Sequence, residues 1–252
     1  MRQAVSIARR LGRKARALGQ RRIASIWPRG VVSFTFDDFP KSAFTNGAAV
    51  LERHGARGTY YTAFGLAGRD EPVGEIFDLE CLCSVLARGH EIGCHTYSHL
   101  DCARADKAHL WAELASNARA IAAVSGGQAM TSFSYPFGAV SPEAKAVTAG
   151  FFSSCRGIEP GINLGVPDYG ALRANKIYAA AYDRQRLRAL VDRNNELGAW
   201  LIFYTHDVGN APSPYGCTQA QLEEVVAYAA ERGPVRPIRE VVARMGIPAR
   251  RI

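Results

Sequence analysis

The sequence predicts an α/β fold in which strands and helices alternate along the chain. Short runs rich in β-branched and aromatic residues, typical of buried strands, are each followed by a longer segment with helical apolar spacing. This alternation recurs about seven times, which predicts parallel strands joined by crossover helices. We find no linker and no internal repeat in the chain. A closed (β/α) barrel and an open doubly wound sheet both agree with this pattern.

The first predicted strand, Val31 to Phe36, ends in two carboxylates, and Pro40 stops regular pairing because proline has no backbone N–H. Later strands are recognised by the same composition, and glycines mark the ends of several helices. The expected strands are 31–36, 58–63, 91–94, 132–135, 151–155, 171–178, 200–204 and a short one that begins at residue 235. The expected helices are 42–54, 76–88, 106–124, 142–149, 183–197, 218–232 and a short one that ends at residue 245.

The composition is that of an ordinary globular protein, with 48% apolar and 21% charged residues in a chain of 252. The net charge of +8 is unevenly distributed, because residues 1–30 contain nine basic residues and no acid. The remainder has 22 basic and 23 acidic residues and is nearly neutral. A neutral body argues against nucleic acid as a partner. No run is as long as a membrane span.

We therefore expect a basic helical leader at 1–28 and a single domain at 29–252. Apolar residues recur in the leader at helical spacing, but arginines interrupt it too often for a secretory signal. The leader helix either contacts an anionic membrane surface from the cytoplasmic side or docks its apolar stripe on the domain. We expect a cytoplasmic protein whose six cysteines are reduced, because no export signal is visible.

Polar side chains follow the carboxyl ends of several predicted strands, which is where parallel α/β folds carry their chemistry. Asp37 and Asp38 follow the first strand, His95 and His99 follow the third, and His206 follows a late one. Helix caps, turns and surface positions are the alternative roles for such residues. No glycine-rich fingerprint follows the first strand, which argues against a dinucleotide site.

Asp38, His95 and His99 form a candidate metal site of two histidines and one carboxylate. The two histidines are four residues apart, so on one helical turn they would share a face and grip one ion. This donor set leaves positions open for water and substrate. Zinc is the first expectation, and cobalt, manganese, nickel and iron are the alternatives.

Four motifs give the chain a family resemblance. Thr35-Phe-Asp-Asp38, His95-Thr-Tyr-Ser-His99, Tyr135-Pro-Phe-Gly138 and Thr205-His206 occur in the order seen in the NodB-like polysaccharide deacetylases, carbohydrate esterase family 4. The resemblance covers roughly Val31 to Asp207. It implies a distorted (β/α)7-type barrel and the metal-dependent removal of acetyl groups from amino sugars.

The resemblance also implies a role for each matching residue. Asp38, His95 and His99 would bind the metal, Asp37 would be the general base and His206 the general acid. The backbone N–H of Phe137 would stabilise the oxyanion, and Tyr135 and Pro136 of the same motif would contact substrate. These roles agree with the chemistry of amide hydrolysis, in which water must lose a proton and the amine must gain one.

The chain departs from the family pattern at several positions. Phe39 stands where glycine is usual, so its ring either stacks on a sugar or packs beneath a loop. The third motif often begins with an arginine that steadies the base. Ser134 stands there, and Arg156 or Arg173 would have to replace that arginine.

Two further positions relate to the acetyl pocket and to the general acid. Tyr204 stands where leucine is common and would line the acetyl pocket. Asp168 is a candidate to orient His206, with an ordinary turn acid as the alternative.

The expected substrate is an N-acetylated glycan, either a polysaccharide, an oligosaccharide or a lipid-linked sugar. The alternatives are a deformylase or O-deacetylase on the same scaffold, and a glycan-binding module without catalysis. A two-histidine-one-carboxylate iron oxygenase is a more distant alternative, because the strand–helix alternation does not suit the jelly roll usual for that chemistry.

Overall fold

The computed structural model describes residues 26–247, so nearly all of the expected leader, 1–28, lies outside the described residues. The main sheet contains β1 (Val31–Phe36), β2 (Thr59–Thr62), β5 (Glu91–Cys94), β6 (Ser132–Ser134), β7 (Ser154–Arg156), β8 (Asn175–Lys176) and β9 (Trp200–Thr205). A separate antiparallel hairpin consists of β3 (Asp70–Glu71) and β4 (Gly74–Glu75).

Helices connect these strands. They are α3 (Ala49–Arg53), α4 (Leu79–Ala87), α5 (Lys107–Val124), α6 (Pro142–Phe151), α7 (Arg184–Leu197), α8 (Gln219–Arg232) and α9 (Ile238–Arg244). Shorter turns are the π-helix η1 (Ala43–Ala48) and the 3₁₀ turns η2 (Phe64–Leu66), η3 (Pro136–Gly138) and η4 (Ala179–Ala181). Within residues 26–247, no helix is both long and apolar enough to cross a membrane.

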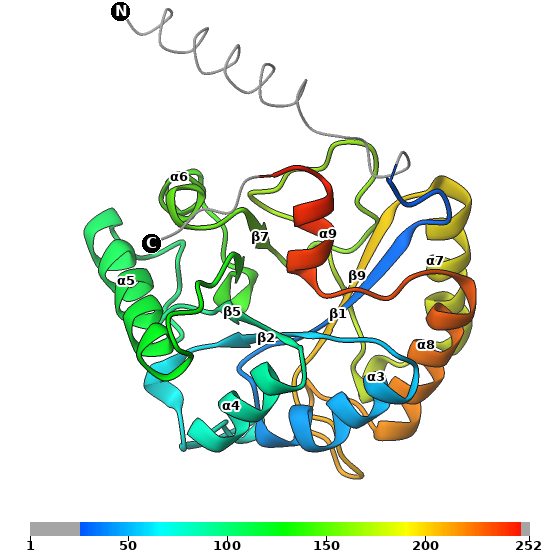
Figure 1. Ribbon diagram of the computed structural model, residues 1–252, viewed down its shortest axis with the longest axis horizontal. Helices are drawn as coiled ribbons and strands as arrows, with labels where there is room; N and C mark the ends of the chain where they lie inside the picture. Colours follow the sequence, from blue (N-terminus) through cyan, green and yellow to red (C-terminus); the bar gives the residue numbers. More distant parts are fainter. Residues whose placement is uncertain (1–25, 248–252) are drawn as a thin grey trace, which may run out of the picture.

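The seven strands are parallel to their neighbours in the order β7-β6-β5-β2-β1-β9-β8. Figure 1 shows the sheet at the centre, with α3 to α8 around its outside. Segment 169–174 brings the two edges together, because the backbone N–H of Cys155 bonds to Tyr169 at 2.7 Å and that of Leu172 bonds to Cys155 at 2.8 Å. The chain then continues into β8. The predicted distorted (β/α)7-type barrel is confirmed, and the open sheet is not formed.

The central strands are buried on both faces, which explains their continuous apolar runs. Every residue of β1, β2 and β9 is buried. Along β1, Phe34 and Phe36 pack outward with the surrounding helices, whereas Val31 packs inside the barrel against Trp200. The interior is therefore a packed core below the site.

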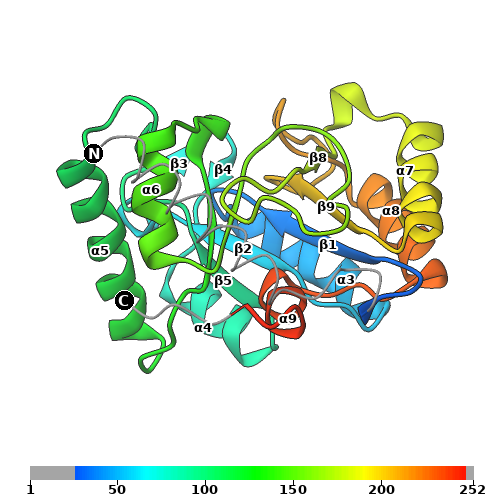
Figure 2. The same cartoon turned by 90° about the horizontal axis from the view of Figure 1, so that it is seen from above.

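Helix α9 closes the amino end of the barrel. Its Ile238 N–H bonds to the Thr59 hydroxyl at 3.0 Å, and the next N–H, of Arg239, bonds to the buried Glu91 carboxylate at 2.8 Å. Figure 2 shows α9 on the opposite side of the sheet from the β3–β4 hairpin. One end of the barrel is therefore covered by α9, and the other end is formed by the loops at the carboxyl ends of the strands.

Most predicted elements are correct in type, with shifted ends and several differences. The short strand expected from residue 235 is not formed, because Val235 makes only an isolated bridge with Val32. The first half of the expected helix 42–54 is the π-helix η1. Helix α6 continues through Phe151, whose ring packs on Trp111 of α5, so the strand after it begins at Ser154. The expected strand 171–178 shrinks to the two residues of β8. The β3–β4 hairpin was not predicted, because two-residue strands carry no readable periodicity.

Candidate active site

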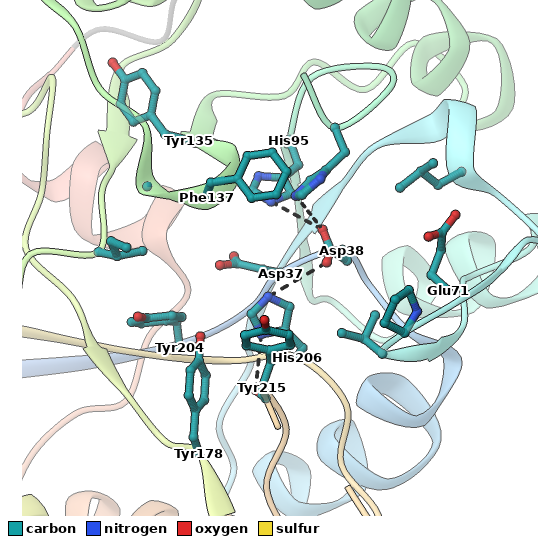
Figure 3. Close-up of a pocket in the computed structure, with 16 residues that line it drawn as sticks. Asp37, Asp38, Glu71, His95, Tyr135, Phe137, Tyr178, Tyr204, His206 and Tyr215 are labelled. Atoms are coloured by element: carbon teal, nitrogen blue, oxygen red, sulfur yellow. Dashed lines mark hydrogen bonds and ion pairs between the residues drawn. The ribbon is translucent and has the colours of Figure 1, made fainter. Parts of the chain in front are cut away.

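A cavity of about 540 Å³ opens among the loops at the carboxyl ends of the strands. Residues predicted from the sequence lie together in its lining, although they are far apart in the chain (Figure 3). They are Asp37, Asp38, His95, His99, Tyr135, Phe137, Tyr204 and His206. The prediction that the strand ends converge on one site is therefore correct.

Asp38, His95 and His99 form a cluster that fits one metal ion. Their nearest ligand atoms all lie within 4.8 Å of one another. The Asp38 Oδ1 is 3.4 Å from His95 Nε2 and 3.2 Å from His99 Nε2. Among the described residues this buried Oδ1 has no hydrogen-bond partner, although buried oxygens are normally satisfied.

The protonation of His95 also fits a metal ion at this cluster. Its Nδ1 lies 2.8 Å from the Ser134 carbonyl oxygen, which can only accept, so Nδ1 carries the proton and Nε2 presents a lone pair. Burial lowers the pKa of His95 to about 3, which keeps the ring neutral. Burial also raises the pKa of Asp38 to about 6, helped by the negative charge of Asp37. A cation bound between Asp38 Oδ1 and His95 Nε2 would satisfy both atoms, which accept no hydrogen bond from the described residues.

The histidines meet on a loop and not on a helical turn, which corrects the sequence-based expectation. Thr96 and His99 have φ of 61° and 60°, in the left-handed region that ends regular structure. Glu113 of α5 holds this loop by accepting from the backbone N–H groups of Tyr97 at 3.0 Å and Ser98 at 2.8 Å. The spacing of four therefore brings the rings together through loop geometry.

Asp37 is held by Arg156, which comes from β7. The Arg156 side chain is fully buried and pairs with the Asp37 carboxylate. It also donates to the Ser134 hydroxyl at 2.5 Å and to the Gly157 carbonyl at 2.9 Å. Burial favours protonation of Asp37, but the charge of Arg156 outweighs it and lowers the pKa of the carboxyl. Asp37 is therefore ionised and does not belong to the cluster of Asp38, His95 and His99.

His206 faces the cluster from the end of β9. Its Nε2 is 3.8 Å from Asp38 Oδ2, and its Nδ1 is 3.2 Å from the Tyr215 carbonyl oxygen. Asp207 fixes the loop that carries this carbonyl, because its carboxylate accepts from the Ser213 N–H at 2.8 Å and hydroxyl at 2.5 Å. The Tyr215 carbonyl thus fixes a proton on Nδ1 and aims Nε2 into the cavity.

A model of the polysaccharide deacetylase family matches residues 26–151, which are 126 of the 252 residues. The chain belongs to the polysaccharide deacetylase family. The matched stretch contains Asp37, Asp38, His95 and His99, so it covers the cluster and the paired carboxylate. The resemblance to carbohydrate esterase family 4 is confirmed.

Solved structures from the same family share the fold. The Xyl-CE4 domain of a multidomain xylanase from the hindgut metagenome of Trinervitermes trinervoides has a TM-score of 0.56 at 18% identity, over 88% of this chain and 94% of that one. A family 4 carbohydrate esterase from Streptomyces lividans, solved with acetate, has a TM-score of 0.54 at 19% identity, over 81% and 90%. A family 4 pseudoenzyme from Bacillus anthracis has a TM-score of 0.57 at 15% identity, over 85% and 66%. Comparison with curated proteins finds no match.

Phe39 is a packing residue in this polysaccharide deacetylase fold, which corrects the suggestion that it contacts a sugar. Its side chain is 0% exposed and stacks on Phe77 with ring centroids 4.9 Å apart. It also packs on Tyr60 and does not line the cavity. Its φ of 54° lies in the region that favours glycine, which accounts physically for the usual family residue.

The third motif lies beside the metal cluster. Phe137, with φ of 58°, is 66% exposed and places its ring edge-on to His99 at 4.4 Å. Pro136 is buried and does not line the cavity, so it makes no substrate contact. Tyr135 reaches the lining, but its hydroxyl bonds to Thr148 at 2.8 Å and points away from Asp37 in Figure 3.

Two supporting candidates lie elsewhere. Arg173 donates to the Pro160 carbonyl at 2.9 Å and does not pair with Asp37. Asp168 pairs with Lys145 and does not orient His206. In each case the alternative holds. Arg156 is the arginine that pairs with Asp37, and Asp168 is a turn acid whose carboxylate accepts from the Gly170 N–H at 3.0 Å.

Sequence reasoning missed part of the lining, including Glu71, Ile158, Tyr178 and Tyr215. Tyr178, Tyr204 and Tyr215 form one aromatic wall with His206, in which Tyr178 lies 5.9 Å from the histidine ring. Tyrosines in loops carry no spacing signal, so only the fold identifies them. The role of Asp207 in fixing the loop beside His206 could have been suggested from the sequence, because Asp207 directly follows the Thr205-His206 motif.

Proposed function

We propose that this chain is a metal-dependent hydrolase that removes N-acetyl groups from amino-sugar units of a glycan. The observation that carries the proposal is the buried Asp38 Oδ1, which faces the Nε2 atoms of His95 and His99 and lacks a donor among the described residues. A divalent ion held by these three residues, zinc first, would supply Lewis-acid activation of a water and of the acetamide carbonyl.

Asp37 has the position and charge of a general base. Arg156 keeps its carboxylate ionised, and the cavity exposes it next to the cluster, so it can accept the proton of the attacking water. Because Arg156 and the Ser134 contact hold the pair in place, the carboxylate stays directed at the cavity. The base is therefore ionised, as a proton acceptor must be.

His206 has the position of a general acid. The nitrogen of an amide leaves poorly unless it is protonated, so a second proton carrier must stand on the other side of the reacting carbon. The Tyr215 carbonyl holds His206 with Nε2 facing the cavity. A protonated Nε2 can give its proton to the departing sugar amine, and the Phe137 N–H is our candidate for stabilising the oxyanion.

The need for His206 favours an amide over an ester as the bond that is cut. An alkoxide leaves from an ester more readily than an amine leaves from an amide, so an O-deacetylase depends less on a general acid. A non-catalytic binding module has no need of the Asp37–Arg156 pair. The presence of all five chemical residues in one cavity therefore supports an active amidase.

Metal analysis of the purified protein, followed by acetate release from N-acetylglucosamine oligomers, tests the proposal. We expect one bound ion, lost in H95A/H99A, and turnover that falls on the order of 10²–10⁴-fold in D37N or H206A while the ion is retained. Formyl and O-acetyl substrates serve as comparison. A metal-loaded protein that releases acetate from O-acetyl sugars but from no N-acetyl sugar would overturn the proposal.

A further inference from the structure

Glu71 is a carboxylate in the cavity that the proposed chemistry does not use. It stands on the β3–β4 hairpin and lines the cavity together with the neighbouring Pro72 and Val73. Within residues 26–247, no hydrogen bond or ion pair involves the Glu71 side chain. In Figure 3 it lies across the cavity from Tyr178 and Tyr204.

The hairpin that carries Glu71 is fixed to the loop that carries the metal ligand. The Phe77 N–H donates to the Phe39 carbonyl at 3.0 Å, and the Ile76 N–H closes the hairpin base on Arg69 at 2.8 Å. Val73 at the tip is 7% exposed and belongs to the main core. Glu71 is therefore held at a fixed position relative to Asp38. A residue that discriminates between substrates needs such a fixed position.

No lysine or arginine side chain of the cavity lining pairs with Glu71. Among the described residues that line the cavity, there is no lysine and no arginine. Arg156 lies beneath the lining and is already paired with Asp37. The aromatic wall opposite includes Tyr178, over whose ring Lys176 Nζ lies 5.4 Å from the centroid, and Tyr215. Such rings attract cations and stack on uncharged sugar rings. Away from the proposed metal ion, the side of the cavity that Glu71 lines therefore repels a carboxylate or phosphate and attracts an ammonium group.

We propose that Glu71 is a specificity-determining residue that selects glycans without negative charge and binds the free ammonium of an already deacetylated sugar next to the reacting unit. This inference rests on the proposed function, because it concerns the glycan on which that reaction would act. Glu71 acts through binding and takes no part in proton transfer. Its effect is therefore expected on the choice between substrates and not on the rate of the best one.

The test compares three N-acetylglucosamine tetramers: the neutral one, one with a single free amine, and one whose primary hydroxyls are oxidised to carboxylates. We expect the ratio of kcat/KM between the neutral and carboxylated tetramers to fall about fivefold in E71Q. The preference for the tetramer with a free amine should fall as well, and both effects should weaken at high salt. E75Q is the matched control, because Glu75 lies on the same hairpin but pairs with Lys41 outside the cavity.

Binding of the fully deacetylated glucosamine tetramer, followed by calorimetry, gives a readout that needs no turnover. Weaker binding in E71Q than in E75Q and wild type supports the role of Glu71 even if no substrate is hydrolysed, in which case the proposed function fails alone. Equal binding, together with unchanged kcat/KM ratios in an active E71Q enzyme, overturns the inference and leaves the proposed function intact.

Discussion

Ser134 and Arg156 face each other in register across β6 and β7, and the Arg156 guanidinium contacts both the Ser134 hydroxyl and the Asp37 carboxylate. The family often carries an arginine where this chain has Ser134. The arginine here comes from the neighbouring strand and reaches the base over the small serine side chain. The ion pair with the Asp37 carboxylate is therefore kept, although its arginine comes from β7 and not from β6.

We predict that Arg156→Met destabilises the protein by about 3–5 kcal/mol, because it leaves the Asp37 carboxylate charged and unpaired in a buried site. Urea unfolding measures the change. D37N/R156M should recover part of the loss, since the uncompensated charge is gone. Arg173→Met is the control, because the Arg173 side chain is exposed and donates to the Pro160 carbonyl. A loss in R156M no larger than in R173M would contradict the prediction.

Stability should also depend on pH through Asp37. The pKa of Asp37 in the folded protein lies below its ordinary value of 3.8. Its ionised form therefore contributes stability above that value, and the contribution is lost as pH falls through the folded pKa. We expect the free energy of unfolding to drop more steeply below pH about 4 in wild type than in D37N. Parallel curves for the two proteins would show that the pair does not lower the pKa.

Removing the metal should lower the melting temperature. A ligand at about one hundred times its Kd stabilises the folded state by about 2.7 kcal/mol, which for a chain of this size corresponds to roughly 5–10 °C. Treatment with a chelator should produce this shift, and added zinc should reverse it. H95A/H99A should not respond to either, whereas H109A, an exposed residue of α5, should behave as wild type. A response retained in H95A/H99A would place the ion elsewhere.

Asp207 is expected to be a positioning residue for His206. In D207A the Ser213 anchor is lost, so the Tyr215 carbonyl no longer fixes the imidazole, and we expect kcat to fall about tenfold with KM nearly unchanged. The pH profile of kcat should change shape, because it reports the acid. D207N, which can still accept one bond from Ser213, should restore most of the rate, and D168A should have no effect. Equal loss of kcat in D207A and D168A would remove this role.

Phe39→Ala should act on stability and not on substrate choice. Truncating a fully buried phenylalanine that stacks on Phe77 and packs at a tilt against Tyr60 costs about 3–5 kcal/mol. The kcat/KM ratios between oligosaccharides of different length should equal those of wild type in the folded fraction. Thermal unfolding and a panel of chain lengths check the two statements. A stable F39A enzyme with altered length preference would restore the sugar-contact hypothesis.

The sequence by itself determined the fold class and the chemical core of the candidate site. Strand–helix alternation requires parallel strands, and residues at their carboxyl ends must meet at one end of a barrel. Asp37, Asp38 and His206 were found in this way. The pair His95 and His99 was also found, although by an argument from helical spacing that the loop between them contradicts.

Only the tertiary structure decided which residues support that core. Arg156 rather than Arg173 pairs with Asp37, because β7 lies beside β6, whereas residue 173 belongs to the closing segment and its side chain bonds to the Pro160 carbonyl. Phe39 is turned into the core by a left-handed backbone, and Glu71 reaches the cavity on a hairpin of two-residue strands. The physical reason is the same in each case. Local spacing fixes which residues share an element, whereas strand order, register and backbone handedness fix which elements' side chains meet.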